Sequence, residues 1–271
     1  GSPAIRLPNR ARNSDYSPEL ISTPTRAFMI TRASIEYLRM TLPIGFAIVI
    51  FCLTQLAHEF LHSTMGNFLA IILLPVAYVA ICTLGVGFVI ALKWLLIGRF
   101  KSGEHPLWSR FIWFNELITG LHDGFAAPLF VDFLMGTPFI ALYLRALGCK
   151  IGKETYIETV NFTEFDLVHI GDHAELNLHA TIQTHLFEDR VFKLSDVHIG
   201  ERCSIGPGSI VLYDAKMHAD SSIEGLSLLM KSEILPEKTA WEGIPVSRRA
   251  EILPPTELNP ETMLVSDLKA S

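Results

Sequence analysis

A six-residue repeat in the C-terminal half of this 271-residue chain restricts its fold more than any other feature. An aliphatic residue recurs at strict spacing, at Ile199, Ile205, Val211, Met217, Ile223, Leu229 and Leu235. Small residues stand four places after most of them, at Cys203, Ser209, Ala215, Ser221, Ser227 and Thr239. Such self-similarity at a short, fixed period indicates a solenoid, in which each repeat stacks on its neighbours.

Three hexapeptides make one triangular coil, so each aliphatic side chain is expected to point inward and to stack on its counterpart one coil later. An earlier run of the pattern includes Ile151, Ile157, Ile170, Leu176 and Ile182. The repeat therefore predicts a left-handed parallel β-helix over residues 149–250, with about four to five coils. Residues 251–271 carry no repeat and are predicted to form a loose C-terminal tail.

The repeat is interrupted twice. The step from Ile157 to Ile170 is one residue too long for two repeats, and the step from Ile182 to Ile199 is eleven residues too long for one. Loops that leave a rigid solenoid are where such proteins place their chemistry. We therefore expect functional residues near 163–169 and within 185–198.

The segment 178–190, which leads into the second interruption, concentrates two imidazoles, two carboxylates and a guanidinium, at His179, His185, Glu188, Asp189 and Arg190. An imidazole with an ordinary pKa of about 6.5 is a common general base, worth about 10²–10⁴ in rate. His185 is the leading candidate for a catalytic base and His179 the weaker one, and Glu188 or Asp189 could orient the imidazole. For either histidine the alternative is an outward-facing corner residue of the coil.

The first interruption contains Glu164 and Asp166, within Thr163-Glu-Phe-Asp166. This segment precedes His185 by about one coil, so both carboxylates are predicted to line the same cleft and to bind substrate. Their acidity would suit a cationic acceptor. Capping of a turn is the alternative role for both side chains.

A metal site is not predicted. His169, His173, His179, His185 and His198 are candidate ligands, but only the first two stand as close together as the histidines of a zinc site usually do. The four cysteines, Cys52, Cys82, Cys149 and Cys203, are widely separated and form no CxxC pair. They are therefore expected to be packed thiols in a reducing compartment.

Two long apolar segments precede the repeat. Residues 40–57 and 63–92 contain no formal charge, and a bilayer core of about 30 Å needs about twenty helical residues. A polar patch with His58, Glu59 and His62 between them suits a turn, so residues 35–100 are predicted to form a two-helix transmembrane hairpin. The alternative, a pair of helices buried in a soluble core, requires more surrounding protein than this chain offers.

The distribution of basic residues predicts the orientation of the hairpin. They lie before it, at Arg26, Arg32 and Arg39, and after it, at Lys93, Arg99 and Lys101. By the positive-inside rule, both termini and the β-helix face the cytoplasm of a multi-pass protein of the inner or plasma membrane. Residues 1–34, which are rich in proline and lack an apolar core, are predicted to be a polar tail and not a signal peptide.

Residues 101–148 mix aromatic and charged side chains and are predicted to form amphipathic, interfacial helices that Pro128 and Pro138 break. The net charge of the chain is only −6, and its basic residues form no run interleaved with aromatics. Nucleic acid is therefore not an expected partner.

Several short strings together resemble a known family. They are Gly136-Thr-Pro-Phe139, Tyr143-Leu-Arg-Ala-Leu-Gly148, Thr163-Glu-Phe-Asp166, Gln183-Thr-His-Leu-Phe-Glu-Asp-Arg190, Val211-Leu-Tyr-Asp214 and Trp241-Glu-Gly-Ile-Pro245. The chain resembles, over about residues 35–250, the C-terminal region of membrane-bound, single-module peptide synthetases of the ε-poly-lysine synthetase kind. In that family an adenylation domain and a carrier domain precede membrane helices interleaved with three condensing domains.

The resemblance implies one condensing unit, which transfers an amino acid from a phosphopantetheine thioester on a carrier protein to an acceptor amine. It implies a carrier and an adenylation domain in cis or in trans, and neighbouring β-helix units in a trimer or pseudo-trimer. It assigns roles to His185, Glu188, Asp189 and Arg190, and places Gln183 and Trp241 among the substrate-binding residues. Two alternatives stay open: a membrane-tethered acyltransferase that uses acetyl-CoA, and a non-catalytic scaffold.

Overall fold

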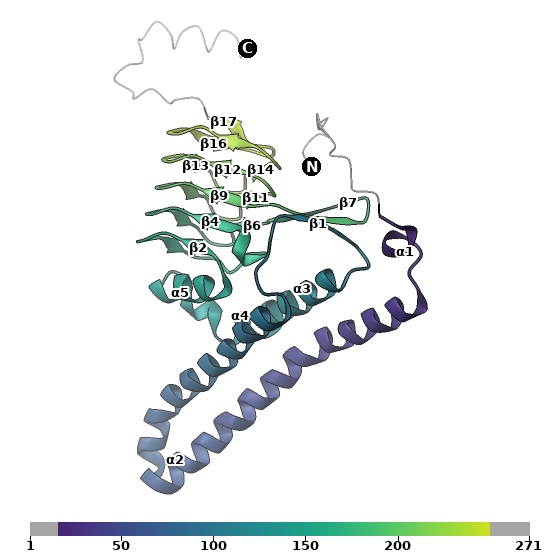
Figure 1. Ribbon diagram of the computed structural model, residues 1–271. Coiled ribbons are helices and arrows are strands. Elements are labelled where there is room, and N and C mark those ends of the chain that lie inside the picture. The colour runs from purple at the N-terminus through teal and green to yellow at the C-terminus, as the bar shows by residue number, and fades with distance from the viewer. Residues whose placement is uncertain (1–15, 250–271) are drawn as a thin grey trace, which may run out of the picture.

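The computed structural model describes residues 16–249. A long, two-armed helix carries a β-solenoid, and short helices fill the space between them (Figure 1). The predicted C-terminal tail, 251–271, and the first fifteen residues of the predicted N-terminal tail lie outside the described residues.

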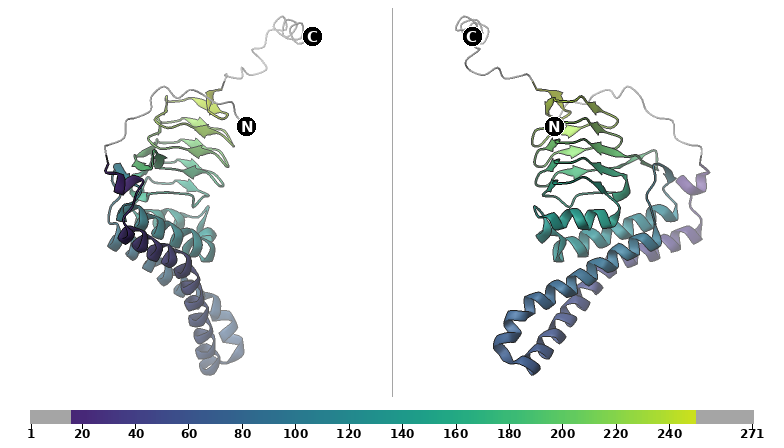
Figure 2. Two further views of the ribbon diagram at one scale, coloured as in Figure 1. Left: turned by 90° about the vertical axis from the view of Figure 1, so that its right-hand side faces the viewer. Right: turned by 60° about the vertical axis from the view of Figure 1, so that its left-hand side comes forward.

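The helical part begins with α1, Pro18–Ile21, and continues with α2, Arg26–Leu96. The backbone of α2 leaves the helical conformation at Gly66, with φ 80° and ψ 168°, and the chain turns back on itself there in all views (Figures 1 and 2). The two arms touch, since the rings of Phe46 and Phe88 lie 5.3 Å apart. By length and composition, Pro18–Leu96 is the one helical stretch among the described residues that could cross a membrane.

The reversal differs in detail from the predicted turn. His58, Glu59 and His62 are helical, and the chain reverses at Gly66 instead. A positive φ explains the difference, because glycine adopts this conformation without the steric cost that a side chain brings.

The start of α2 also corrects the predicted tail, because the helix begins at Arg26 and not near residue 35. The hydroxyl of Thr25 caps this end by accepting a hydrogen bond from the backbone N–H of Phe28. The ring of Phe28 packs edge-on against Trp113, at 6.0 Å between centroids. The segment is therefore held by contacts to α3 (Arg110–Leu121), a later helix whose position local composition does not reveal.

Between α2 and the solenoid the chain forms one strand and several short helices. These elements are β1 (Gly103–Pro106), α3 (Arg110–Leu121), the π-helical η1 (His122–Ala126), α4 (Ala127–Leu129), the 3₁₀-helical η2 (Val131–Leu134) and α5 (Pro138–Leu147). Thr137 caps α5 and Pro138 occupies its first turn, where a missing N–H costs nothing. Ile112, Trp113 and Leu121 of α3 are buried, which makes this helix part of the core.

The solenoid consists of three sheets of very short parallel strands. One sheet has the order β15-β12-β9-β4-β2, the second has β16-β13-β10-β5-β3 with the antiparallel β17 at its end, and the third has β14-β11-β6. The strands are β2 (Lys150–Ile151), β3 (Tyr156–Ile157), β4 (Val168–Ile170), β5 (Glu175–Leu176), β6 (Thr181–Ile182), β9 (Val197–Ile199), β10 (Ser204–Ile205), β11 (Ile210–Val211), β12 (Lys216–Met217), β13 (Ser222–Ile223), β14 (Leu228–Leu229), β15 (Ile234–Leu235), β16 (Ala240–Glu242) and β17 (Ser247–Arg248).

The register of these strands stacks the aliphatic positions of the repeat. Ile205 pairs with Leu176 on one side and with Ile223 on the other, and Met217 pairs with Leu235. The interior side chains are almost completely buried. The predicted stack of aliphatic side chains in a β-helix is therefore confirmed.

The corners of the solenoid use residues in the left-handed backbone region. These recur every six positions, at Arg202, Gly208, Asp214, Asp220, Leu226, Ser232 and Lys238. His179, with φ 57°, occupies an equivalent corner one coil earlier and is exposed. It is thus the outward-facing corner residue that the sequence offered as the alternative to a catalytic role.

Both interruptions of the repeat are ordered. The second forms an antiparallel hairpin of β7 (His185–Glu188) and β8 (Val191–Leu194), which projects from the solenoid and pairs with β1 (Figure 1). At the first, Glu164 has an unusual backbone conformation (φ 21°, ψ 70°) and leads into the 3₁₀ turn η3, Phe165–Leu167. No prediction covered β1, because its partner β8 is remote in sequence.

Candidate active site

The two interruptions of the repeat meet at one pair of side chains. Nδ1 of His185 lies 2.9 Å from Oε2 and 3.1 Å from Oε1 of Glu164. His185 opens the projecting hairpin, and Glu164 lies on the segment one coil earlier. The solenoid thus brings together the leading candidate base and one of the predicted carboxylates.

The carboxylate of Glu164 is buried, with 2% of the residue exposed. Besides His185, it accepts hydrogen bonds from Nδ2 of Asn115 and from the hydroxyl of Thr184, each at 2.7 Å. Thr184 is fixed in turn, because its backbone N–H donates to the hydroxyl of Thr163 at 2.9 Å. A buried charge needs such partners, and here the donors come from α3 and from the second interruption.

This arrangement determines the tautomer of the imidazole. An ionised carboxylate only accepts hydrogen bonds, so Nδ1 of His185 carries the proton that it donates to Glu164. In the neutral ring, Nε2 then keeps its lone pair and can accept a proton. The geometry is that of a positioned general base with a carboxylate behind it.

The imidazole lines a cavity of about 230 Å³ between the solenoid and the helices. The walls come from α2, α3, η1, the first interruption and the hairpin, through Arg39, Ile112, Asn115, Glu116, Thr119, Gly120, Asp123, Thr163, Glu164, His185, Phe187 and Phe192. Phe192 packs against the imidazole with 4.7 Å between ring centroids. The ring is therefore held by an apolar contact as well as by its hydrogen bond.

The charged groups of the cavity are mostly acidic. Glu116 is paired with Arg32, at 3.0 Å between Oε2 and Nη2, and partial burial raises the pKa of this carboxyl group. Arg39, the one basic residue of the lining, pairs with Glu36 outside the cavity, at 3.0 Å. With Asp123, the lining suits a substrate that carries a positive charge.

The structure corrects the orienting role predicted for Glu188 and Asp189. Glu188 forms ion pairs with Lys193, at 3.0 Å, and with Lys231 in a later coil. Asp189 and Arg190 form the tip of the hairpin, with φ values of 51° and 63°. The hairpin runs away from the cavity beyond Phe187, so these three residues do not line it.

Other predicted site residues also lie outside the cavity. Asp166 points to the opposite side of the 163–167 segment, where it pairs with Lys93 at 2.5 Å. The backbone N–H of Gln183 donates to Val211, and the indole of Trp241, in the last coil, donates to Thr239. His179 is at its exposed corner, so of the predicted substrate-binding residues only Glu164 lines the cavity.

Sequence reasoning missed the helix side of the site. Asn115, Glu116 and Asp123 lie on α3 and η1, which approach the solenoid only in the folded chain. Thr184 had a signal, since it directly precedes His185 in the interruption, but hydroxyl residues are too common at such places to single it out.

One group of potential metal ligands occurs among residues 16–249. The donor atoms of His169, Asp196 and His198 all lie within 4.8 Å of one another on the outer face of neighbouring coils. Asp196 already accepts hydrogen bonds from His169, at 2.7 Å, and from Ser102, at 2.5 Å. The expectation of no metal stays a prediction.

The fold and site together define a β-solenoid, built on hexapeptide repeats, in which a carboxylate holds a histidine beside a cavity. No protein-family model matches the chain. In a comparison over 251 residues that covers 90% of the chain, the chain is 38% identical to the Delta-poly-L-ornithine synthetase of Acinetobacter baumannii (strain AB307-0294). The predicted resemblance to the poly-amino-acid synthetases is thereby confirmed, and the chain spans 18% of the length of that relative.

Similar solved structures include acetyltransferases of low sequence identity. A hexapeptide-repeat acetyltransferase of Vibrio cholerae, complexed with acetyl coenzyme A, is 17% identical with a TM-score of 0.35, over 40% of this chain and 62% of the other. Soybean serine acetyltransferase, complexed with serine, is 15% identical with a TM-score of 0.36, over 74% and 69%. These values are too low to carry an inference about this chain.

Proposed function

We propose that this chain is a condensing unit that forms an amide bond between an aminoacyl thioester and an acceptor amine. The observation that carries the proposal is the contact between Nδ1 of His185 and the buried carboxylate of Glu164, beside an acidic cavity. The similarity of the chain to a poly-ornithine synthetase also supports amide-bond formation.

In the proposed step, the neutral amine of the acceptor attacks the carbonyl carbon of the thioester. A C–N bond forms and the C–S bond breaks. Nε2 of His185 takes the proton that the amine loses and returns it to the departing sulfur, so the products are an amide and a free thiol. Glu164 stabilises the imidazolium that exists between the two transfers and keeps the ring in the required orientation.

The donor is proposed to be an amino acid on the phosphopantetheine arm of a carrier protein. An adenylation domain would load that carrier, and both would act in cis or in trans. The much greater length of the relative supports additional domains, because it leaves room for them outside the matched segment.

The acceptor is proposed to be a cationic amino acid, such as the ornithine in the name of the relative. Glu116 and Asp123 support this choice, because they line the cavity beside Glu164. A second cationic group on the substrate would pair with Asp123, because Glu116 is already paired with Arg32, while the neutral amine of the substrate approaches His185.

We also propose that the two arms of α2 form a transmembrane hairpin, with the β-helix on the cytoplasmic side of the inner or plasma membrane. Large apolar side chains are exposed along both arms, among them Ile48, Phe51, Phe68, Ile71 and Leu84. Exposure of this apolar surface to water would cost free energy, whereas contact with lipid would not. The basic residues at the solenoid end of both arms support the orientation.

The solenoid is proposed to be left-handed and to act beside other β-helix units in a trimer or pseudo-trimer. Two features support the left-handed sense of the solenoid: its aliphatic positions and its left-handed corners both recur strictly every six residues. Exposed apolar side chains on the outer faces, such as Ile210 and Ile234, support contact with a neighbour.

The proposal is tested with the purified chain in detergent and an aminoacyl-pantetheine donor, which replaces the carrier protein. Ornithinyl-pantetheine and free ornithine are supplied, and the amide is measured by mass spectrometry. His185→Gln is expected to lower the rate by about 10²–10⁴. His173→Gln is the matched control, because this histidine is well exposed, at 53% of its side chain, and lies outside the cavity.

The same assay separates the two alternatives. Turnover of acetyl-CoA with a simple amine, and none with the aminoacyl donor, would favour an acetyltransferase. No amide from the unaltered chain alone, with an unchanged amide rate when His185 is replaced in the intact assembly, would indicate a scaffold role for this unit.

A further inference from the structure

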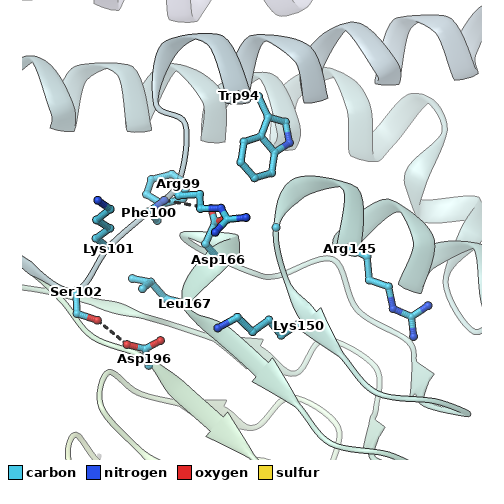
Figure 3. A pocket seen from close by; sticks show the side chains of 11 residues that line it. Trp94, Arg99, Phe100, Lys101, Ser102, Arg145, Lys150, Asp166, Leu167 and Asp196 are labelled. Carbon is cyan, nitrogen blue, oxygen red and sulfur yellow. Dashed lines mark hydrogen bonds between the residues drawn. The ribbon is translucent and has the colours of Figure 1, made fainter.

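A second, larger cavity lies where α2 ends against the first coil. Its volume is about 540 Å³, and its lining is Trp94, Arg99, Phe100, Lys101, Ser102, Arg145, Gly148, Lys150, Asp166, Leu167 and Asp196. Figure 3 shows Trp94 reaching in from α2 and Lys150 from the solenoid, with Arg99 and Lys101 on the connecting segment. Four cationic side chains thus surround one space.

The acidic residues of this cavity are already neutralised. Asp166 pairs with the buried Lys93 and accepts a hydrogen bond from the backbone N–H of Phe100 at 3.2 Å. Asp196 accepts hydrogen bonds from Ser102 and His169. Among residues 16–249, no ion pair engages Arg99, Lys101 or Lys150. The cavity therefore keeps a net positive charge, to which an anion would be attracted.

An apolar groove of about 660 Å³ lies between α2 and α5. Its lining is Val79, Thr83, Val86, Gly87 and Ile90 of α2, with Phe130, Phe133, Leu134, Phe139, Leu142 and Tyr143. Almost none of this lining is polar.

Helical spacing places the groove next to the basic cavity. Trp94 stands one helical turn beyond Ile90 on α2, and Arg145 stands three residues beyond Leu142 on α5, so each pair shares one helix face. The indole of Trp94 also donates to the carbonyl oxygen of Ala146, at 2.8 Å, and so ties the two helices together at the junction.

We propose that the groove and the basic cavity together bind one anionic phospholipid, with an acyl chain along α2 and α5 and the phosphate among Arg99, Lys101 and Lys150. The length of the groove agrees with the thickness of one leaflet. The groove extends along α2 from Val79 to Ile90, which is about 16 Å of helix, and half of a bilayer core is about 15 Å. The phosphate then lies at the solenoid end of α2, where the headgroups of that leaflet are expected.

The groove distinguishes a lipid from the other phosphate-bearing ligand in this system, a phosphopantetheine arm. That arm carries two amides, which need hydrogen-bond partners when they are buried. In the groove the polar side chains are Thr83, whose hydroxyl donates to Val79, and Tyr143, which is bonded to His122. An acyl chain needs no such partners, so the groove favours the lipid.

This inference rests on the proposed membrane insertion of α2 and is independent of the amide-forming step. Its test therefore measures binding and not turnover. Loss of activity in a His185 variant would leave it unaffected, and a failure to bind lipid would leave the proposed reaction unaffected.

The headgroup part is tested by native mass spectrometry of the full chain in detergent, with phosphatidylglycerol and phosphatidylcholine of identical acyl chains. The unaltered chain is expected to retain phosphatidylglycerol preferentially. The double variant Arg99→Gln with Lys150→Gln is expected to lose this preference, with about tenfold weaker binding or more. Lys238→Gln with Lys153→Gln removes the same charge from exposed solenoid residues and should change nothing.

The tail part is tested by filling the groove. A Cβ at Gly87 meets no atom within 4 Å, so Gly87→Leu adds a side chain to the groove without a backbone clash, and it should weaken lipid binding. Gly45→Leu is the matched control, since Gly45 is equally open but lies on the other arm.

Three results would overturn the proposal: equal retention of both lipids, no change in the double variant, or no difference between the two glycine variants. Free coenzyme A and inorganic phosphate are added as competitors. Displacement of the lipid by millimolar phosphate alone would support a site for the headgroup phosphate. Binding of coenzyme A in place of any lipid would overturn the assignment of the ligand.

Discussion

His185 and Glu164 are 21 positions apart, yet Nδ1 of the imidazole lies 2.9 Å from Oε2 of the carboxylate. The chain makes this contact because both residues leave the solenoid at its interruptions, one coil apart. Glu164 does not approach the cavity as a free acid but is enclosed by donors from Asn115 and Thr184. It acts on the substrate through His185 and is therefore a positioning residue.

Replacement of this carboxylate should impair catalysis strongly. Glu164→Gln keeps the size of the side chain, but its amide can donate to Nδ1 and so favour the wrong tautomer of His185. We expect the amide-forming rate constant kcat to fall by about 10² or more while KM changes little, because the substrate does not touch this oxygen. The measurement is the steady-state rate with the aminoacyl-pantetheine donor across pH.

Glu175→Gln is the matched control for this change, because Glu175 is an exposed residue of β5 in the neighbouring coil. A Glu164 variant with an unaltered pH profile and kcat would contradict the positioning role. An equal loss of folded protein in both variants would point to stability and not to proton transfer.

Glu188 should behave differently, although the family resemblance names it. Its side chain bridges Lys193 on β8 and Lys231 in a later coil and so fastens the hairpin to the solenoid. Glu188→Gln is expected to cost about 1–3 kcal/mol in the free energy of unfolding, and to leave kcat far closer to normal than Glu164→Gln does. Chemical denaturation and the rate assay, run on both variants, compare the two effects.

The same ion pairs make the Glu188 contribution depend on pH. The hydrogen bond from Lys231, followed by that from Lys193, lowers the pKa of Glu188 below its ordinary value of 4.5. A carboxylate with a lowered pKa stabilises the fold above its unfolded pKa, and this stability is lost as the pH falls through the folded value. The stability difference between Glu188→Gln and the unaltered chain should therefore shrink below about pH 4.5.

The solenoid was predictable because a six-residue period determines which side chains face its interior. Every sixth residue must be apolar to fill the interior, and the pairing of Ile205 with Ile223 follows from three repeats per coil. The interruptions were predictable for the same reason, as departures from a strict count. His185 and Glu164 were both found in this way, each as a candidate.

Their partnership was not predictable from the count. Which carboxylate faces the imidazole depends on the backbone at Glu164 and on the direction of the hairpin, and sequence reasoning assigned the orienting role to Glu188 or Asp189. Asn115 is a further example, because a buried amide on a helix outside the solenoid has no local signature. Its contact to Glu164 spans 49 residues and requires α3 to be placed first.

His122 predicts a second dependence of stability on pH. The residue is buried; its Nε2–H donates to the carbonyl oxygen of Val160, at 3.2 Å, and its Nδ1 accepts a hydrogen bond from the hydroxyl of Tyr143, at 2.7 Å. Burial lowers the pKa of His122 below its ordinary value of 6.5. The folded chain thus holds this imidazole neutral where the unfolded chain would protonate it.

The contribution of His122 to stability therefore decreases as the pH falls. Above about pH 6.5 both states are neutral and the contribution of His122 is fully present, and as the pH falls towards the folded pKa the unfolded state gains a proton and stability is lost. His122→Asn should flatten the decline of thermal stability between about pH 6.5 and 5, although it lowers stability at pH 8. His173→Asn, at an exposed position, should leave the slope as it is. An unchanged slope in the His122 variant would mean that other groups cause the decline.

Lys93 and Asp166 give the last prediction, which concerns the junction of helix and solenoid. No part of the Lys93 side chain is exposed, and its Nζ lies 2.5 Å from Oδ2 of Asp166. Removal of one partner leaves a buried charge without its counter-ion, so Asp166→Asn should destabilise the fold by about 3–5 kcal/mol. The paired change Lys93→Met with Asp166→Leu removes both charges and should recover much of this loss, because desolvation of an ion pair offsets most of its attraction. Denaturant titrations of Lys93→Met, Asp166→Leu and the doubly substituted protein, beside the unaltered chain, complete a double-mutant cycle. If Asp166 instead served the amide-forming step, as its place in the predicted cleft implied, the doubly substituted protein would fold but would not form the amide.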